Sequence, residues 1–160
     1  MNLHNLNELP EWKDGHKDGE DWKEKPTLNA CKTLYKKWNE ITGMLCGALG
    51  SVKEIADEEE PFSKETKAMI LGDAYEAGAK IRSSEAGDGM YILRMENAAI
   101  IRKNAQFIKT AILGLMIEGD VDEEHGEIIR KEIDVFRELF KKWVNTFEKD
   151  EYTDDWGLFI

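Results

Sequence analysis

Apolar residues recur at every seventh position along several long stretches of the chain. The first stretch holds two such rows side by side: Cys31, Trp38, Leu45 and Val52, and Leu34, Ile41, Ala48 and Ile55. Residues seven apart fall on one face of an α-helix, because two helical turns take close to seven residues. The pattern therefore predicts one amphipathic helix over residues 27–58, which the acidic run at 57–60 and Pro61 bring to an end.

Three further helices follow from the same periodicity and from the turn signals between them. The second is predicted over residues 62–84, and a loop rich in serine and glycine follows it. The third is predicted over residues 90–118 and the fourth over 121–149. Between these two, Gly119 ends one helix, Asp120 caps the next, and Glu123 completes a capping-box-like pair. Four long helices with short connections favour an all-α fold, an up-down-up-down four-helix bundle over residues 27–149.

Irregular segments flank the predicted bundle. Residues 1–26 form an N-terminal arm with a repeated Lys-Asp-Gly, which is a turn signal and lacks the alternating acidic residues of a calcium-binding loop. Residues 150–160 form a short C-terminal tail in which acidic residues surround large apolar ones.

The tail offers a candidate partner-binding segment in Trp156, Leu158 and Phe159. Large apolar side chains supply contact area, and the acidic residues around them would steer the tail toward a groove with a basic rim. Two alternatives stay open. These side chains fold back and cap the bundle, or the tail is disordered.

The predicted helix over residues 90–118 is apolar around most of its circumference, whereas a helix in a lone bundle needs only an apolar stripe. The excess apolar surface has to be covered. A homodimer formed through this helix would cover it, with Gly114 letting a second backbone come close. The arm, with Trp12 and Trp22, would also cover it, and the two arrangements are compatible.

Two asparagines, Asn97 and Asn104, interrupt the apolar face of this helix at a spacing of seven. A buried amide without a hydrogen-bond partner costs about 1–3 kcal/mol, so partners are expected. Folding the chain back at its turns places Glu76 level with Asn97, and Arg94 one turn away. These four residues form either a buried polar layer that fixes helix register or a pocket for a compact polar ligand. In a third alternative the asparagines face solvent.

The charge balance narrows the choice of partners and location. Lys and Arg number 22 against 33 Asp and Glu, a net charge of −11, so a basic protein partner fits and direct nucleic-acid binding is not expected.

No stretch approaches the roughly 18 consecutive apolar residues of a membrane span, and the N-terminus lacks the apolar core of a secretory signal. Cys31 and Cys46 lie roughly 22 Å apart in the predicted helix, too far for a disulfide. A reducing, cytoplasmic location is therefore expected.

Little in the sequence points to catalysis, and no cofactor is expected. The three histidines are too few for a site that needs several, and no nucleophile or phosphate-loop motif occurs. One enzymatic alternative is an all-α, magnesium-dependent nucleotide pyrophosphohydrolase. Its metal ligands would be the carboxylates of Glu54, Asp57, Asp73 and Glu76, although they depart at two positions from an E-x-x-E and E-x-x-D pattern.

Three functions therefore remain open. The leading interpretation is a non-catalytic protein–protein interaction or assembly module, because it requires the fewest unproven groupings of residues. The second is a ligand-binding bundle with a small polar pocket near Asn97. The third is the magnesium-dependent phosphohydrolase.

Overall fold

The computed structural model describes residues 26–59, 61–85 and 90–159, and within these ranges all regular structure is helical. Five helices occur in the order α1 (Pro26–Leu49), α2 (Val52–Ala56), α3 (Pro61–Ser83), α4 (Tyr91–Glu118) and α5 (Glu123–Val144). The prediction of an all-α chain is thus confirmed. The predicted arm, apart from Pro26, lies outside the described residues, and so do Trp12 and Trp22.

The helix predicted over residues 27–58 is two helices, and that expectation was wrong. At Gly50 the backbone enters the left-handed region with a φ of 94°, which ends α1. Ser51 then caps α2. Its hydroxyl accepts from the backbone N–H of Glu54 at 3.2 Å, while its own N–H donates to the Glu54 carboxylate at 2.6 Å. Because of the break, Val52 no longer continues the buried row and is 45% exposed.

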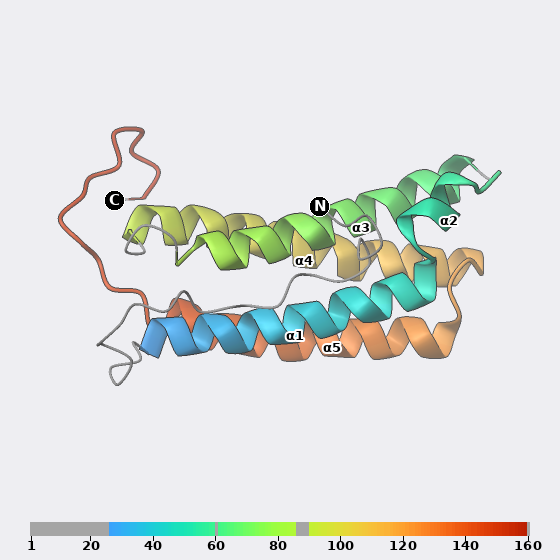
Figure 1. The fold of residues 1–160 in the computed structure, drawn as a ribbon, viewed down its shortest axis with the longest axis horizontal. Helices are drawn as coiled ribbons and strands as arrows, with labels where there is room; N and C mark the ends of the chain where they lie inside the picture. Colours follow the sequence, from blue (N-terminus) through green and yellow to red (C-terminus); the bar gives the residue numbers. More distant parts are fainter. Residues whose placement is uncertain (1–25, 60, 86–89, 160) are drawn as a thin grey trace.

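The four long helices lie side by side along the longest axis of the molecule (Figure 1). Helix α1 packs against α3 and α5, and α4 packs against the same two helices, while α2 packs on α3. Two lysines of α3 hold that last contact. Lys64 donates to the Ala56 carbonyl and Lys67 to the Glu58 carboxylate, both at 2.7 Å.

The turn between α4 and α5 lies where the sequence predicts it, but its capping residue differs. Gly119 ends α4 in the left-handed region, with a φ of 82°. Asp122 rather than Asp120 is the N-cap of α5, and its carboxylate accepts from the backbone N–H of His125 at 3.1 Å. Because the cap lies two residues later, Glu123 is the first residue of α5 and does not complete the predicted pair.

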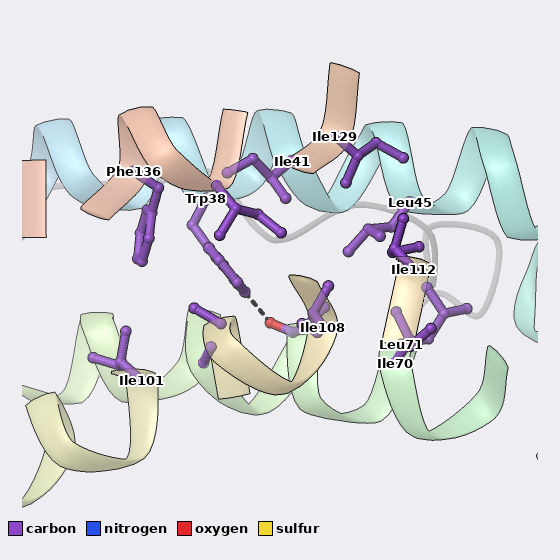
Figure 2. Packing of buried hydrophobic residues seen from close by; sticks show 14 of the residues in the cluster. Trp38, Ile41, Leu45, Ile70, Leu71, Ile101, Ile108, Ile112, Ile129 and Phe136 are labelled. Carbon is purple, nitrogen blue, oxygen red and sulfur yellow. Dashed lines mark hydrogen bonds between the residues drawn. The ribbon is translucent and has the colours of Figure 1, made fainter. Parts of the chain in front are cut away.

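The core is formed by the heptad rows, and aromatic side chains dominate one end of it. Trp38 extends from α1 toward the opposite pair of helices, and its indole donates to the Ala74 carbonyl of α3 at 2.7 Å (Figure 2). Its ring centroid lies 4.6 Å from that of Phe136, and the ring contacts continue along α5 through Phe140, Trp143 and Phe147. Such pairs add about 0.5–1.5 kcal/mol each beyond the area they bury.

The excess apolar surface predicted for α4 is for the most part half-buried within one chain. Phe107, Ala111 and Met116 pack against the core from its edge, while Ile117 is 79% exposed. Gly114 is exposed, with nothing near a Cβ built on it. Among the described residues, no helix has the length and apolar character needed to cross a membrane.

Candidate functional site

The tail forms a compact turn around the carboxylate of Asp154. This side chain accepts from the backbone N–H groups of Trp156 at 3.0 Å, Leu158 at 2.6 Å and Phe159 at 2.9 Å. These bonds hold the Asp154 pKa below its usual value, with the Phe159 N–H making the largest contribution. Gly157, with a φ of 68°, allows the chain to reverse inside the turn. The tail is therefore ordered by its own hydrogen bonds.

The turn directs two of the three predicted tail residues outward. Trp156 is 95% exposed and Leu158 is 71% exposed, whereas Phe159 is half-buried. Phe159 lines a hollow against α4 and α5, together with Met95, Ala98, Ala99, Arg102, Phe140 and Val144. The alternative in which the whole tail caps the packed helices thus applies to Phe159 but not to Trp156 or Leu158.

The base of the tail is fixed to the start of α4. The N-cap residue of this helix, Met90, makes no side-chain capping bond. Asp150 supplies one instead, because its carboxylate accepts from the backbone N–H of Tyr91 at 2.9 Å. An acid at a helix N-terminus is also favoured by the helix dipole. The tail thereby starts from a defined position beside α4.

A groove of about 250 Å³ lies between α4 and α5, and it shares Arg102 and Phe140 with the hollow that Phe159 lines. Apolar side chains of both helices line it, namely Ala105, Ile133, Phe136 and Phe140. Four cations line it as well: Arg102 and Lys109 of α4, and Arg137 and Lys141 of α5. Asp134 is the one acid among the lining residues. An apolar lining with a cationic rim suits a ligand that combines large apolar groups with negative charge.

Neighbouring acids already engage three of these four cations. Lys109 donates to Asp134 at 2.6 Å and Arg137 lies 3.3 Å from the same carboxylate, while Lys141 pairs with Glu138 at 3.2 Å. The Lys109 bond lowers the Asp134 pKa most, so this carboxylate stays charged. No ion pair to Arg102 occurs among the described residues, although this residue lines both the groove and the Phe159 hollow.

Sequence reasoning missed this groove. The cations looked scattered along the chain, and only their spacing of seven in α4 and of four in α5 signals that each pair shares a helix face. That the two faces meet across one groove depends on how α4 and α5 pack.

The buried asparagines each hydrogen-bond within the chain. The Asn104 amide donates to the Glu76 carboxylate at 2.7 Å and to the Asp73 carbonyl at 3.3 Å, and the Asn97 amide donates to the Ser83 hydroxyl at 3.3 Å. Asn104 is fully buried, yet its side-chain carbonyl oxygen has no hydrogen-bond partner among the described residues. Both amides thus bond from α4 to α3.

The predicted polar layer is spread along α4 instead of gathered at one level. The expectation that Glu76 lies level with Asn97 was wrong by seven residues, because Glu76 contacts Asn104. Arg94 pairs with Glu85 at 2.9 Å, with both side chains largely buried, and its guanidinium lies 6.0 Å from the Phe147 ring centroid. Of the four predicted residues, Glu76 and Asn104 contact each other, whereas Asn97 and Arg94 have other partners, so the four do not form a single pocket.

The four acidic residues of the phosphohydrolase alternative are divided between two helices, and the carboxylates of Glu54 and Glu76 are already hydrogen-bonded. Glu54 completes the capping box of α2, and Asp57 is the C-cap residue of the same helix. Asp73 and Glu76 lie on α3, where burial raises the Asp73 pKa. Over the described part of the chain, no three side chains of His, Cys, Asp or Glu are grouped so as to hold a metal ion. The geometry thus gives this alternative no support.

The two cysteines are free thiols in different surroundings. Cys31 is fully buried and its thiol donates to the Ile81 carbonyl at 3.3 Å. Burial raises its pKa far above the usual value, so the reactive thiolate is strongly disfavoured. Cys46 is half-buried, 3.8 Å from the Tyr75 hydroxyl, and burial raises its pKa as well.

Comparisons with protein-family models, with curated proteins and with solved structures give no match for this chain. A functional assignment therefore depends on the tail and the groove themselves.

Proposed function

We propose that this protein is a non-catalytic protein–protein interaction module whose tail, through Trp156 and Leu158, contacts the partner. The observation that carries the proposal is the exposure of these two apolar side chains on a turn that three hydrogen bonds to Asp154 hold in place. An interface anchored by an aromatic residue on an ordered segment avoids part of the entropy cost of binding.

The helices serve as the scaffold of this module in our proposal. The four long helices would act as an up-down-up-down four-helix bundle, with α2 as a short insertion in the first connection. The packing of α1 and α4 each against α3 and α5 supports this arrangement. The Asp150 bond to the Tyr91 N–H then fixes the origin of the tail on the scaffold.

The charge of the tail indicates the kind of partner. Asp150, Glu151, Asp154 and Asp155 surround the apolar side chains, and residues 150–160 contain no lysine or arginine. We therefore propose a partner surface with an apolar centre and a basic rim, met in the cytoplasm. Complementary charge of this kind speeds association and excludes acidic surfaces.

Affinity capture from extracts of the source cells tests the proposal. The full chain is expected to retain a specific partner, and the double variant Trp156→Ala/Leu158→Ala is expected to lose it. The melting temperature should stay within about 2 °C of the wild-type value, because substitutions of exposed side chains seldom exceed about 0.5 kcal/mol.

The matched control is Phe62→Ala, which removes an apolar side chain of comparable exposure near the start of α3. It should leave capture unchanged. Equal capture by the wild type and the tail variant would refute the proposal. A large fall in the melting temperature of the tail variant would instead show that these side chains support the fold.

A further inference from the structure

We propose that the groove between α4 and α5 binds the acidic, aromatic tail of a second copy of this chain. The inference rests on the proposed function, because it takes the tail as the contacting segment and names the surface that receives it. Trp156 of one copy would then complete a site that the other copy leaves open.

Charge complementarity is the first argument for this occupant. The tail contributes four acids over residues 150–155. The groove contributes Arg102, Lys109, Arg137 and Lys141 against the single acid Asp134. In a chain of net charge −11, this local concentration of positive charge is opposite in sign to the acidic tail and therefore complementary to it. Arg102 has no ion pair among the described residues, so it can bind an incoming carboxylate without first losing an existing partner.

The apolar content of the two surfaces also matches. The groove is lined by Ala105, Ile133, Phe136 and Phe140, and the tail exposes Trp156 and Leu158. Placing an indole on this lining would remove both apolar surfaces from water. A tryptophan buries about 150–250 Å² in such contacts, which is why it so often anchors an interface.

The chain's own tail forms part of the wall of an adjacent hollow. Phe159 lines this hollow together with Arg102 and Phe140, and Arg102 and Phe140 also line the groove, so the two surfaces are continuous. The Asp154 turn leaves Trp156 exposed while Phe159 is half-buried. With this turn formed, the chain's own Trp156 is 95% exposed and does not line the groove, whereas a second copy could supply its Trp156 with the turn intact.

Reciprocal exchange would limit the assembly to two copies. Each copy has one tail and one groove, and a two-fold axis lets both contacts form at once. The resulting dimer includes α4, the helix whose exposed and half-buried apolar residues already suggested an interface.

Sedimentation equilibrium over a wide concentration range tests this proposal on the full chain. The wild type is expected to show a monomer–dimer equilibrium that weakens as salt is added. Trp156→Ala/Leu158→Ala should raise the dissociation constant by roughly 30-fold or more, as is usual for an anchoring aromatic residue. Arg102→Glu/Arg137→Glu should do the same from the groove side.

The control for the groove variant is Lys131→Glu/Lys142→Glu. Both lysines lie exposed on α5, neither lines the groove, and the change in net charge is the same. The control should leave the dissociation constant within about threefold of wild type, since exposed single charges contribute little. If it weakened the dimer as much as the groove variant, charge alone would explain the effect and the proposal would fail.

A mixing experiment separates exchange between copies from folding back within one copy. The tail variant and the groove variant should each be monomeric, yet a mixture should form a heterodimer through the one intact tail and the one intact groove. A wild type that stays monomeric at every concentration would overturn the inference, as would a mixture that does not associate. Partner capture that persists in a monomeric wild type would leave the proposed function standing while this inference fails.

Discussion

Asn104 illustrates how one polar side chain connects two helices through an apolar interface. The residue is fully buried on α4, and its amide reaches a carboxylate and a backbone carbonyl of α3. Because a lone donor in this position would be costly, the two bonds also define the register in which α3 and α4 pack.

Replacing Asn104 by alanine is expected to lower the free energy of unfolding by about 1–3 kcal/mol, because both bonds are lost and a small cavity remains. Urea titration of the full chain measures the change. Glu96→Ala, which truncates an exposed polar side chain on the same helix, is the control and should stay within about 0.5 kcal/mol. A loss no larger than that of the control would show that the Asn104 bonds do not stabilise the fold.

Residue spacing identified Asn97 and Asn104 as special, but it did not identify their partners. Spacing along α4 depends only on helix geometry, which is the same in every protein. The partner depends on how far α3 is displaced along its axis relative to α4, and that displacement is set by packing across the whole interface. Glu76 therefore met Asn104 rather than Asn97.

At the scale of the helices, the break at Gly50 shows that the heptad pattern of apolar residues does not reveal where a helix ends. Val52 and Ile55 continue the apolar rows of α1 in sequence, so the pattern reads as one uninterrupted helix. The left-handed backbone at Gly50 and the Ser51 cap redirect the chain all the same. The Ser51–Glu54 spacing is a capping-box signal that the heptad pattern hid.

Two glycines on the α4–α5 hairpin should respond to alanine in opposite ways. A Cβ at Gly114 would meet open space, so Gly114→Ala should stabilise the fold by about 0.5–1 kcal/mol through helix propensity alone. A Cβ at Gly126 would overlap the Met116 sulfur, so Gly126→Ala should be destabilising despite the same gain in propensity.

Thermal unfolding of both variants, each also made in a Met116→Ala background, checks this pair. Removing the Met116 side chain should convert Gly126→Ala from destabilising to neutral or stabilising, and should leave the Gly114→Ala effect unchanged. Equal effects at the two glycines would contradict close packing of α4 on α5 at Gly126.

For the whole molecule, composition and periodicity predicted the helical class, but not where the charges gather. The net charge of −11 is a sum over the whole chain and does not show how charges are distributed. The cationic rim between α4 and α5 is a positive region on this acidic protein. The rim arises because Arg102 and Lys109 share one face of α4 while Arg137 and Lys141 share one face of α5. Only the packing of the two helices brings those faces together.

The location and composition of the tail could be predicted from the sequence, but its conformation could not. Its acidic and apolar residues stand out in the sequence, whereas the turn depends on one carboxylate accepting three backbone N–H groups. Which of Trp156, Leu158 and Phe159 faces solvent follows from that turn and from the position of Phe159 in the wall of a hollow beside α4 and α5.

Because Cys31 is buried, modification of its thiol can report directly on unfolding of the helices around it. A reagent can modify the Cys31 sulfur only after α1 has separated from the helices that cover it, since the side chain is inaccessible and its thiolate is disfavoured. In a Cys46→Ser background, the rate of maleimide modification should therefore follow the global unfolding equilibrium and carry its full dependence on urea. Adding Asn104→Ala should accelerate the reaction by roughly 5- to 150-fold, the factor that corresponds to a loss of about 1–3 kcal/mol. A rate unaffected by urea would instead reveal a local fluctuation near the start of α1.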